Sequence, residues 1–159
     1  MQIWLIRHAV AEEPGDFGGP DFERPLTEKG KRRFRAFADW LAASTGGPAK
    51  IVSSPLVRAM ETAELLGKAY DIKKRDILEE SAVGPGVTAQ ALLECAQAQG
   101  VERLAIVGHQ PDLAINTAAL LGGGQVVFDK GCVAAIELPR LAVGSGRLLW
   151  FVGPKLGGD

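Results

Sequence analysis

Short apolar runs alternate along this chain with longer segments that have a helical hydrophobic period. Residues 2–6, 50–53 and 104–107 are apolar runs with β-branched members, and they predict buried β-strands. In residues 34–42 and 56–66, apolar side chains recur at the spacing of one buried helical face. This alternation of strands and helices predicts an α/β fold, a three-layer α/β/α sandwich with a mostly parallel sheet.

Local signals predict where the helices begin and end. Thr27 and Thr88 each precede a helical pattern and are predicted N-caps, and Gly100 is expected to end the helix that follows Thr88. Ser54 followed by Pro55 predicts another helix start, because proline fits the first helical position.

The remaining segments complete the expected topology. Pro111 is expected to open a helix that the glycines at 122–124 close. Residues 126–128, 133–138 and 147–152 are strand-like, and the last two runs are expected to pair antiparallel at an edge of the sheet. Residues 9–25 are rich in glycine and proline, which predicts a long loop of the kind that often has a function.

Length and composition favour one globular domain over residues 1–159. The chain has 159 residues, of which 47% are hydrophobic and 23% charged, close to soluble averages, so a disordered chain and a fibre are disfavoured. The net charge of −1 gives no basic excess to hold nucleic acid or an anionic membrane surface, so neither is an expected partner.

The start of the chain and its cysteines suggest a cellular setting. The apolar start at residues 1–6 is short, and Arg7 and His8 follow it at once, so we expect a first strand rather than a signal peptide. Cys95 and Cys132 lie far apart and are expected to be reduced. We therefore expect a cytoplasmic protein.

Cationic and nucleophilic side chains follow the ends of the predicted strands. Arg7 and His8 follow the first strand, Arg58 lies in the helix after the second, and His109 follows the third. Ligands of α/β sheets bind at the carboxyl ends of the strands, so these four residues are candidates for one site. Each histidine taken singly is more often structural, and only the joint placement favours a function.

The chemistry of these four residues suits a phosphoryl group. An arginine in a first helical turn meets the positive end of the helix dipole, and a bound anion would remove that conflict. The guanidinium groups of Arg7 and Arg58 can each hold phosphate oxygens with paired hydrogen bonds. His8 would attack phosphorus, while His109 and the arginines would stabilise the charge.

Four segments of the sequence resemble motifs of the histidine phosphatase superfamily, which has the phosphoglycerate-mutase-like fold. Residues 5–9 (LIRHA) resemble its RHG motif, and residues 53–63 (SSPLVRAMETA) are similar to SPLxRAxQTA. Residues 107–109 (VGH) and 24–30 (RPLTEKG) are similar to two further motifs in the same order. The resemblance implies that His8 is the nucleophile and that the other three residues complete the phosphate pocket.

Two positions depart from these motifs. Ala9 stands where the family has glycine, so the backbone there must accommodate a Cβ atom. Glu61 replaces the usual glutamine, and we expect this to be a surface difference.

The short chain and the stretch at residues 21–26 resemble bacterial phosphohistidine phosphatases, which implies a phosphorylated histidine of a phosphotransfer protein as substrate. A small-molecule phosphomonoesterase is the alternative enzyme. A non-catalytic module that binds phosphorylated partners is the alternative from another class. The sequence leaves the physiological substrate and the oligomeric state open.

The group that protonates the leaving group is the least defined part of the prediction. The resemblance implies a carboxylate after the middle strand, where Glu80 is preferred over Glu79, although both are equally well explained as solvated acids. Acids of the 9–25 loop, namely Glu12, Glu13 and Asp16, are further candidates. A phosphoramidate needs less help, since its nitrogen can be protonated before the P–N bond breaks.

No cofactor is expected. The sequence contains no Walker motif and no cluster with metal-ligand spacing, and both histidines are already assigned to phosphate. We therefore expect a metal-independent reaction.

Overall fold

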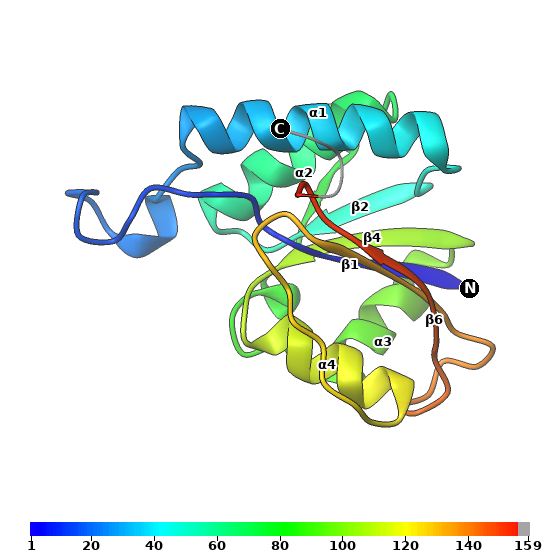
Figure 1. The fold of residues 1–159 in the computed structure, drawn as a ribbon. Coiled ribbons are helices and arrows are strands. Elements are labelled where there is room, and N and C mark those ends of the chain that lie inside the picture. The colour runs from blue at the N-terminus through cyan, green and yellow to red at the C-terminus, as the bar shows by residue number, and fades with distance from the viewer. Residues whose placement is uncertain (156–159) are drawn as a thin grey trace.

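The structure is a computed structural model, and it describes residues 1–155. Within these residues six strands form one sheet in the order β3-β2-β4-β1-β5-β6 (Figure 1). Strands β3, β2, β4 and β1 are parallel, whereas β5 is antiparallel to β1 and β6 is antiparallel to β5. The mostly parallel sheet and its antiparallel edge are thus confirmed. The strands are β1 (Gln2–Arg7), β2 (Lys50–Ser53), β3 (Leu78–Glu79), β4 (Arg103–Gly108), β5 (Val133–Glu137) and β6 (Arg147–Val152).

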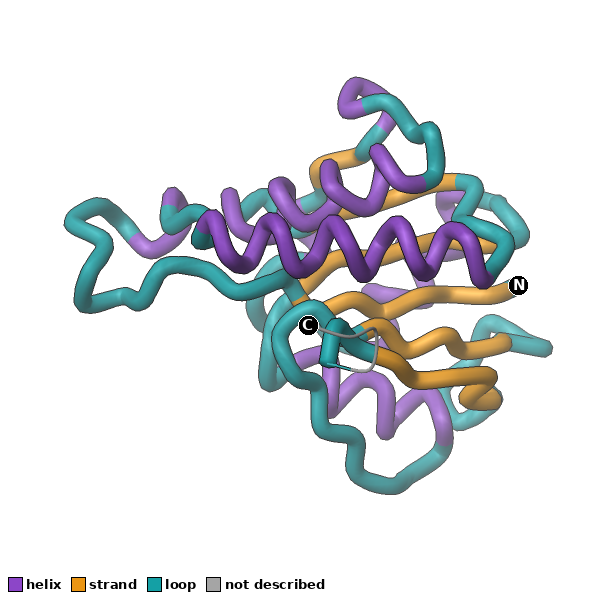
Figure 2. The backbone as a smooth tube through the Cα atoms, turned by 45° about the horizontal axis from the view of Figure 1, so that its top comes forward, coloured by secondary structure: helices purple, strands orange, loops and turns teal. Residues whose placement is uncertain are grey.

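Helices cover both faces of the sheet (Figures 1 and 2). On one face lie α1 (Glu28–Ser44) and α2 (Val57–Ala69), and on the other α3 (Ala89–Gln99) and α4 (Asp112–Leu121). Alternate residues of β1 face opposite layers, as the strand period requires. Trp4 belongs to the hydrophobic core under α1 and α2, whereas Ile3 and Leu5 belong to the core under α3 and α4. The three-layer sandwich is therefore confirmed. Short 3-10 helices are η1 (Asp21–Glu23), η2 (Lys74–Asp76) and η3 (Ser81–Val83).

The predicted caps of α1 and α3 are present. Thr27 Oγ1 accepts a hydrogen bond from the Gly30 N–H at 2.9 Å, and Thr88 Oγ1 accepts one from the Ala91 N–H at 3.2 Å. Gly100 ends α3 in the left-handed conformation, with φ of 59°, which glycine adopts without a Cβ penalty.

The predicted start of α2 is wrong. The helix begins at Val57 rather than after Ser54, and the cap residue Leu56 is extended and makes no side-chain cap. The Ser54 hydroxyl instead lies 2.7 Å from His109 Nε2, a contact across two strands. The Ser54 hydroxyl therefore makes both this tertiary contact and a local hydrogen bond with the Leu56 N–H, and it lies two residues before the position that a regular cap of α2 would occupy.

The strand predicted at residues 126–128 is also absent. Three glycines with positive φ, at positions 122–124, precede this segment and turn the chain away from a strand path. The Phe128 carbonyl accepts a hydrogen bond from Arg7 Nη1 at 2.7 Å rather than from a neighbouring strand. The segment therefore lies beside the end of β1 as an irregular loop.

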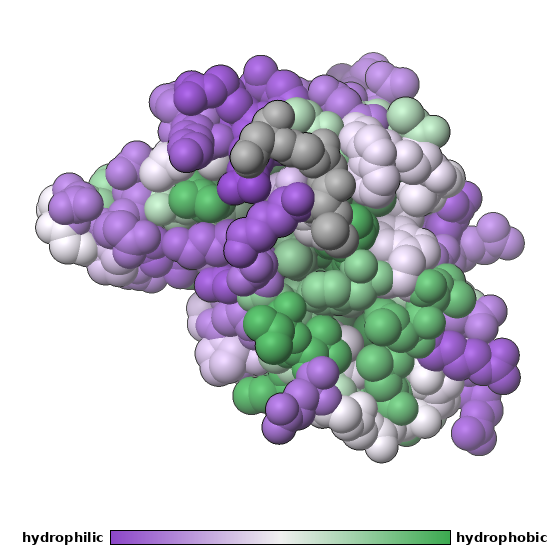
Figure 3. All heavy atoms as spheres, viewed as in Figure 1, coloured by the Kyte–Doolittle hydropathy of each residue, from purple (hydrophilic) through white to green (hydrophobic). Residues whose placement is uncertain are grey.

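The surface differs between the two ends of the sheet. Figure 3 shows a mostly hydrophilic surface over α1 and the 9–25 loop, and a hydrophobic area over β6 and the chain after α4. Leu148 and Leu149 of β6 and Val127 are among the exposed apolar residues. The sheet is therefore less covered at its β6 edge than at its centre. In the described part of the chain, no helix combines the length and hydropathy needed to cross a membrane.

The 9–25 loop extends away from the body of the molecule (Figure 1). It is anchored at its base by an antiparallel bridge between Ala11 and Leu26, and η1 forms its returning limb. Glu61 of α2 fixes the same base, since its carboxylate accepts the Leu26 N–H at 2.7 Å and lies 2.9 Å from Lys31 Nζ. Glu61 is therefore a structural tie between α2 and the loop, and not the surface difference that we expected.

Candidate active site

The three central strands bring the predicted residues to one place. β2, β4 and β1 are parallel neighbours, so their carboxyl ends meet at one edge of the sheet. A cavity of about 260 Å³ lies at this edge, and Arg7, His8, Arg58 and His109 all line it. The structure therefore gathers four side chains that are up to about a hundred residues apart in the sequence.

The first strand ends where the cavity begins. β1 stops at Arg7, and the Gly131 N–H lies 3.1 Å from the carbonyl oxygens of both Arg7 and His8. In a regular strand, neighbouring side chains point to opposite faces of the sheet. Because the strand ends at Arg7, consecutive residues both reach the cavity.

His8 is held with one ring nitrogen available. Its Nδ1 lies 2.8 Å from the Ala9 carbonyl oxygen, which can only accept, so the proton is on Nδ1. Nε2 then carries the lone pair. Burial lowers the pKa of His8 to about 3, with smaller contributions from His109, Arg58 and Arg7, while the Ala9 hydrogen bond opposes the shift. At neutral pH the imidazole is therefore uncharged and nucleophilic.

Ala9 fits where the related motif has glycine. Among the described residues, Asp71 is the one non-glycine residue with a positive φ, so Ala9 occupies an ordinary backbone conformation. Its N–H donates to Thr62 Oγ1 at 3.0 Å, and its side chain is buried. The Cβ atom is accommodated without strain, and the strand end keeps the geometry that His8 needs.

His109 is fixed by Ser54. Its Nε2 lies 2.7 Å from Ser54 Oγ, and the Leu56 N–H donates to the same oxygen at 3.4 Å. The other ring nitrogen, Nδ1, is buried and has no hydrogen-bond partner in residues 1–155. Burial, followed by the charge of Arg58, lowers the pKa of His109 to about 4. The two histidine rings lie 5.3 Å apart between centroids, close enough to face a common group.

Arg7 and Arg58 are anchored in the same way. Nη1 of Arg7 donates to the Phe128 carbonyl at 2.7 Å, and Nη1 of Arg58 donates to the Asp21 carbonyl at 2.8 Å. In both arginines Nε is buried and has no hydrogen-bond partner within the described chain. An unsatisfied buried donor costs about 1–3 kcal/mol, more when it is charged. An anion in the cavity could remove this cost by accepting from both guanidinium groups.

Three further charged residues of the site, Arg24, Lys130 and Asp21, were missed by the sequence analysis. Arg24 lines the cavity, and its Nε lies 2.9 Å from Asp21 Oδ1. The other carboxylate oxygen of Asp21 lies 3.0 Å from Arg58 Nη2. The side-chain hydrogen bond from Arg24, together with the nearby Arg58, holds the pKa of Asp21 below its ordinary value. Arg24 could have been found from the sequence, because it belongs to the RPLTEKG segment that resembles a family motif. For Asp21 the sequence offered only its position in the 9–25 loop.

The structure does not bring Glu79 or Glu80 to the cavity. Glu80 accepts a hydrogen bond from the Ala82 N–H at 3.1 Å and thereby caps η3, and Glu79 is an exposed residue of β3. The carboxylate that does line the cavity is Glu13, which lies 3.6 Å from Lys130 Nζ. A role of Glu80 in protonating a leaving group therefore stays a prediction.

The arrangement can bind a tetrahedral dianion beside a neutral nucleophile. Arg7, Arg24, Arg58 and Lys130 supply positive charge at the wall, and Glu13 is the acid that lines the same space. Such a set positions and stabilises a phosphoryl group during transfer. In residues 1–155 no group of three or more histidine, cysteine, aspartate or glutamate side chains is arranged to hold a metal ion.

Comparisons with known proteins agree with this geometry. The family model described as "Histidine phosphatase superfamily (branch 1)" matches residues 3–87. An uncharacterized protein of Picosynechococcus sp. is 35% identical over 124 residues, which cover 77% of this chain and 74% of that protein. The phosphohistidine phosphatase SixA of Escherichia coli is 26% identical over 157 residues, which cover 97% of this chain and 94% of that protein.

Solved structures agree on the fold. The structure of the protein histidine phosphatase SixA complexed with tungstate superposes with a TM-score of 0.85 and 24% identity, and the match covers 98% of this chain and 99% of that one. The similarity therefore extends over the sheet and both helical layers, including the later strands that the family model does not reach.

Proposed function

Because the chain belongs to the histidine phosphatase superfamily, we propose that it is a phosphohistidine phosphatase that works through a covalent intermediate on His8. The observation that carries the proposal is the state of His8, whose Nδ1 is tied to the Ala9 carbonyl and whose Nε2 is unprotonated. The relative from Escherichia coli that matches almost the whole chain is named a phosphohistidine phosphatase, and this supports the substrate class. The substrate would be a phosphorylated histidine of another protein.

In the first step, the lone pair of His8 Nε2 forms a bond to phosphorus. The bond between phosphorus and the imidazole nitrogen of the substrate breaks, and that imidazole leaves in a protonated or neutral form. The guanidinium groups of Arg7 and Arg58, which both line the cavity, hold non-bridging oxygens, and His109 lines the same cavity. Because the leaving nitrogen can carry its proton beforehand, this step does not require a carboxylic acid in the cavity.

In the second step, water attacks the phosphorus of phosphorylated His8. The P–N bond breaks, His8 regains its lone pair and inorganic phosphate leaves with the protons of the water. The same arginines stabilise the charge in both steps, since both pass through a similar transition state. We propose that neither step uses a metal ion, so activity is expected to persist in excess chelator. The cytoplasmic location stays a prediction.

The experiment that tests the proposal is a substrate panel with detection of the intermediate. A phosphohistidine-bearing phosphotransfer domain and a simple phosphate ester are each incubated with the parent protein and with His8→Ala. We expect turnover of the phosphohistidine protein, a rapidly formed phosphoryl adduct on His8 by mass spectrometry at alkaline pH, and neither in His8→Ala. His109→Ala is the control, because it leaves the nucleophile in place and is expected to be labelled slowly.

Three results would separate the alternatives. Preference for the ester would favour a small-molecule phosphomonoesterase. Binding of phosphorylated protein without turnover would indicate a recognition module. Full activity of a folded His8→Ala variant would show that the nucleophile is wrongly assigned.

A further inference from the structure

The residues that line the catalytic cavity run from a buried floor to an exposed rim. His8, Arg58 and His109 are buried, whereas the Glu13 side chain is 68% exposed. In phosphoryl transfer the attacking and leaving groups lie roughly in line across phosphorus. Because His8 attacks from the buried side, the leaving group lies towards the rim, where Glu13 is found.

A phosphorylated imidazole leaves more easily when its second ring nitrogen carries a proton. The electron pair of the broken P–N bond then forms a neutral imidazole instead of an imidazolate anion. The structure provides for this at His8, whose Nδ1–H is held by the Ala9 carbonyl at 2.8 Å, so phosphorylated His8 keeps that proton in the second step. An acceptor at the rim would do the same for the imidazole of the substrate in the first step.

Glu13 is the side chain of the lining that supplies a charged acceptor. Four cationic side chains line the cavity and offer donors only, namely Arg7, Arg24, Arg58 and Lys130. Gln110 lines it too, but its amide is neutral and its side-chain oxygen already accepts the Ala114 N–H at 3.2 Å. Among the described residues of this lining, the Glu13 carboxylate is therefore the group best suited to accept from a protonated imidazole.

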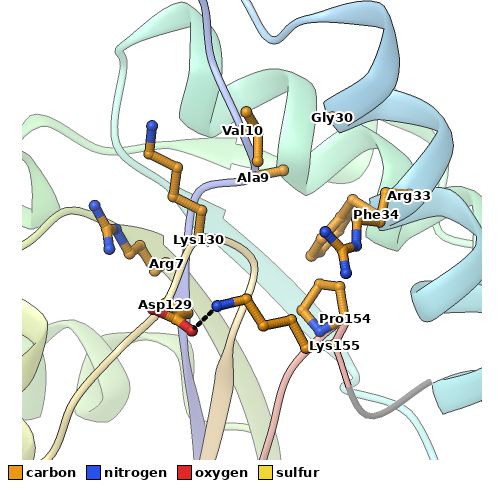
Figure 4. Close-up of a pocket in the computed structure, with 10 residues that line it drawn as sticks. All are labelled: Arg7, Ala9, Val10, Gly30, Arg33, Phe34, Asp129, Lys130, Pro154 and Lys155. Carbon is orange, nitrogen blue, oxygen red and sulfur yellow. Dashed lines mark hydrogen bonds and ion pairs between the residues drawn. The ribbon is translucent and has the colours of Figure 1, made fainter. Parts of the chain in front are cut away.

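Lys130 holds the Glu13 carboxylate at the cavity. The Glu13 Oε1 atom lies 3.6 Å from Lys130 Nζ. Asp129, the acid next to Lys130 in the chain, is paired with Lys155 Nζ at 2.7 Å, and Figure 4 shows Lys130 extending away from that pair. A carboxylate has lone pairs for more than one donor, so Glu13 can keep Lys130 and also accept from a substrate.

We propose that Glu13 accepts the free ring N–H of the substrate's phosphohistidine and thereby makes the site selective for this leaving group over an ester oxygen. The carboxylate stays ionised throughout. His8 Nε2 forms the bond to phosphorus, the electron pair of the P–N bond goes to the leaving nitrogen, and the proton stays on the other ring nitrogen. This role rests on the proposed function, and it is that of an acceptor rather than of the proton donor for which the loop acids were candidates.

The test compares a phosphohistidine-bearing phosphotransfer domain with p-nitrophenyl phosphate, whose leaving group needs no proton and has no ring N–H. Single-turnover rates with saturating enzyme are measured for the parent, Glu13→Gln and Asp16→Asn, because such rates report phosphoryl transfer within the complex. Asp16→Asn is the matched control. It removes the same charge from an exposed position of the same loop outside the cavity lining, and it retains the Asp16 N–H that donates to the Glu13 carbonyl at 3.0 Å.

Glu13→Gln is expected to slow transfer from phosphohistidine about three- to tenfold relative to the ester at about pH 8, the range of a charge-assisted hydrogen bond at a partly exposed position. The rate on phosphohistidine falls as pH rises through the pKa of the bound substrate's imidazole. Removal of the carboxylate lowers this pKa, so the fall is expected about 0.5–1 pH unit lower in Glu13→Gln. Asp16→Asn is expected to match the parent in both measurements.

Two kinds of result would overturn this role of Glu13 and leave the proposed function intact. One is an equal loss on both substrates, or an unshifted pH profile on phosphohistidine, in Glu13→Gln. The other is an equal effect of Asp16→Asn, which would assign the change to the overall charge of the loop. If the parent does not turn over phosphohistidine at all, the proposed function fails and the role of Glu13 fails with it.

Discussion

Asp21 holds the cavity-lining arginine Arg58 through both its backbone and its side chain. The Asp21 carbonyl accepts from Arg58 Nη1 at 2.8 Å, and its carboxylate lies 3.0 Å from Nη2. The same carboxylate lies 2.9 Å from Arg24 Nε, so one negative charge separates two guanidinium groups that would otherwise repel each other. Asp21 thereby ties the 9–25 loop to the cavity that Arg58 lines.

Asp21→Ala is therefore expected to weaken inhibition by vanadate about two- to fivefold, because Arg24 and Arg58 lose the charge that orients them. The inhibition constant of vanadate is measured for the parent and the variant. KM and kcat are measured separately, so that a change in binding is distinguished from a change in turnover. Glu23→Gln, in the same turn of η1, is the control, since within residues 1–155 its carboxylate makes no hydrogen bond or ion pair with either arginine. Tighter vanadate binding in Asp21→Ala would show instead that the carboxylate mainly competes with the anion.

Ser54→Ala is expected to lower kcat/KM about two- to tenfold. The Ser54 hydroxyl lies 2.7 Å from His109 Nε2, and a neutral hydrogen bond of this kind contributes about 0.5–1.5 kcal/mol. Steady-state kinetics and a denaturant titration are measured together, so that a loss of stability is separated from a loss of orientation. Ser53→Ala is the matched control, because Ser53 is an equally buried neighbour whose hydroxyl bonds to the Ser54 carbonyl instead. Equal kinetics in the two variants would remove Ser54 from the site.

Glu80→Gln is expected to change turnover of a phosphohistidine protein by less than about twofold. The Glu80 carboxylate caps η3 outside the cavity, and a P–N bond can break without an added acid. Turnover of phosphohistidine and of a phosphate ester is compared for Glu80→Gln and its neighbour Glu79→Gln. A loss of tenfold or more on either substrate in Glu80→Gln alone would contradict the expectation and assign the residue to proton transfer.

The buried histidines are expected to make the fold less stable in acid. The pKa of His8 is lowered to about 3 in the folded protein, against an unfolded value near 6.5. Between these values the unfolded chain binds more protons, so the free energy of unfolding falls as pH falls from about 6.5 towards 3. At pH 5 this loss is about 2 kcal/mol for His8, and His109, with its pKa near 4, adds a similar amount.

Urea unfolding at pH 8 and pH 5 checks this prediction in the parent and in His8→Ala. The variant is expected to lose about 2 kcal/mol less than the parent between the two pH values. Identical pH dependence in the two proteins would mean that His8 is not buried in its neutral form. Inorganic phosphate is expected to reduce the acid sensitivity of the parent, because a bound dianion favours the protonated imidazole.

The sequence allowed most of the layers to be predicted because hydrophobic periodicity reports burial directly. The stripe in α1, the caps at Thr27 and Thr88 and the apolar runs of β1, β2 and β4 are all local signals. Convergence of the strand ends then followed from parallel topology. The start of α2 was mispredicted because Leu56 is extended, so that the helix begins at Val57, and the contact of Ser54 with His109, 55 residues away, has no local signal.

The difference between local signals and long-range contacts also explains which residues of the site were missed. His8, Arg58 and His109 lie next to recognisable element ends, whereas Asp21 and Lys130 reach the cavity area only through the paths of two irregular loops. Loop paths depend on contacts such as that between Arg7 and the Phe128 carbonyl, which have no periodic signature. The charged loop residues of the site could therefore be identified from the structure but not from the sequence.

The cavity walls come from the ends of β1 and β4, from α2, from the 9–25 loop and from the loop before β5, so no short fragment of this polypeptide contains the whole cavity. Orthophosphate is therefore expected to bind the folded chain and not the unfolded chain, so that phosphate binding increases the free energy of unfolding. At a concentration one hundred times its Kd, such an ion would add about 2.7 kcal/mol to conformational stability. Orthophosphate would then stabilise the folded chain as well as being a reaction product.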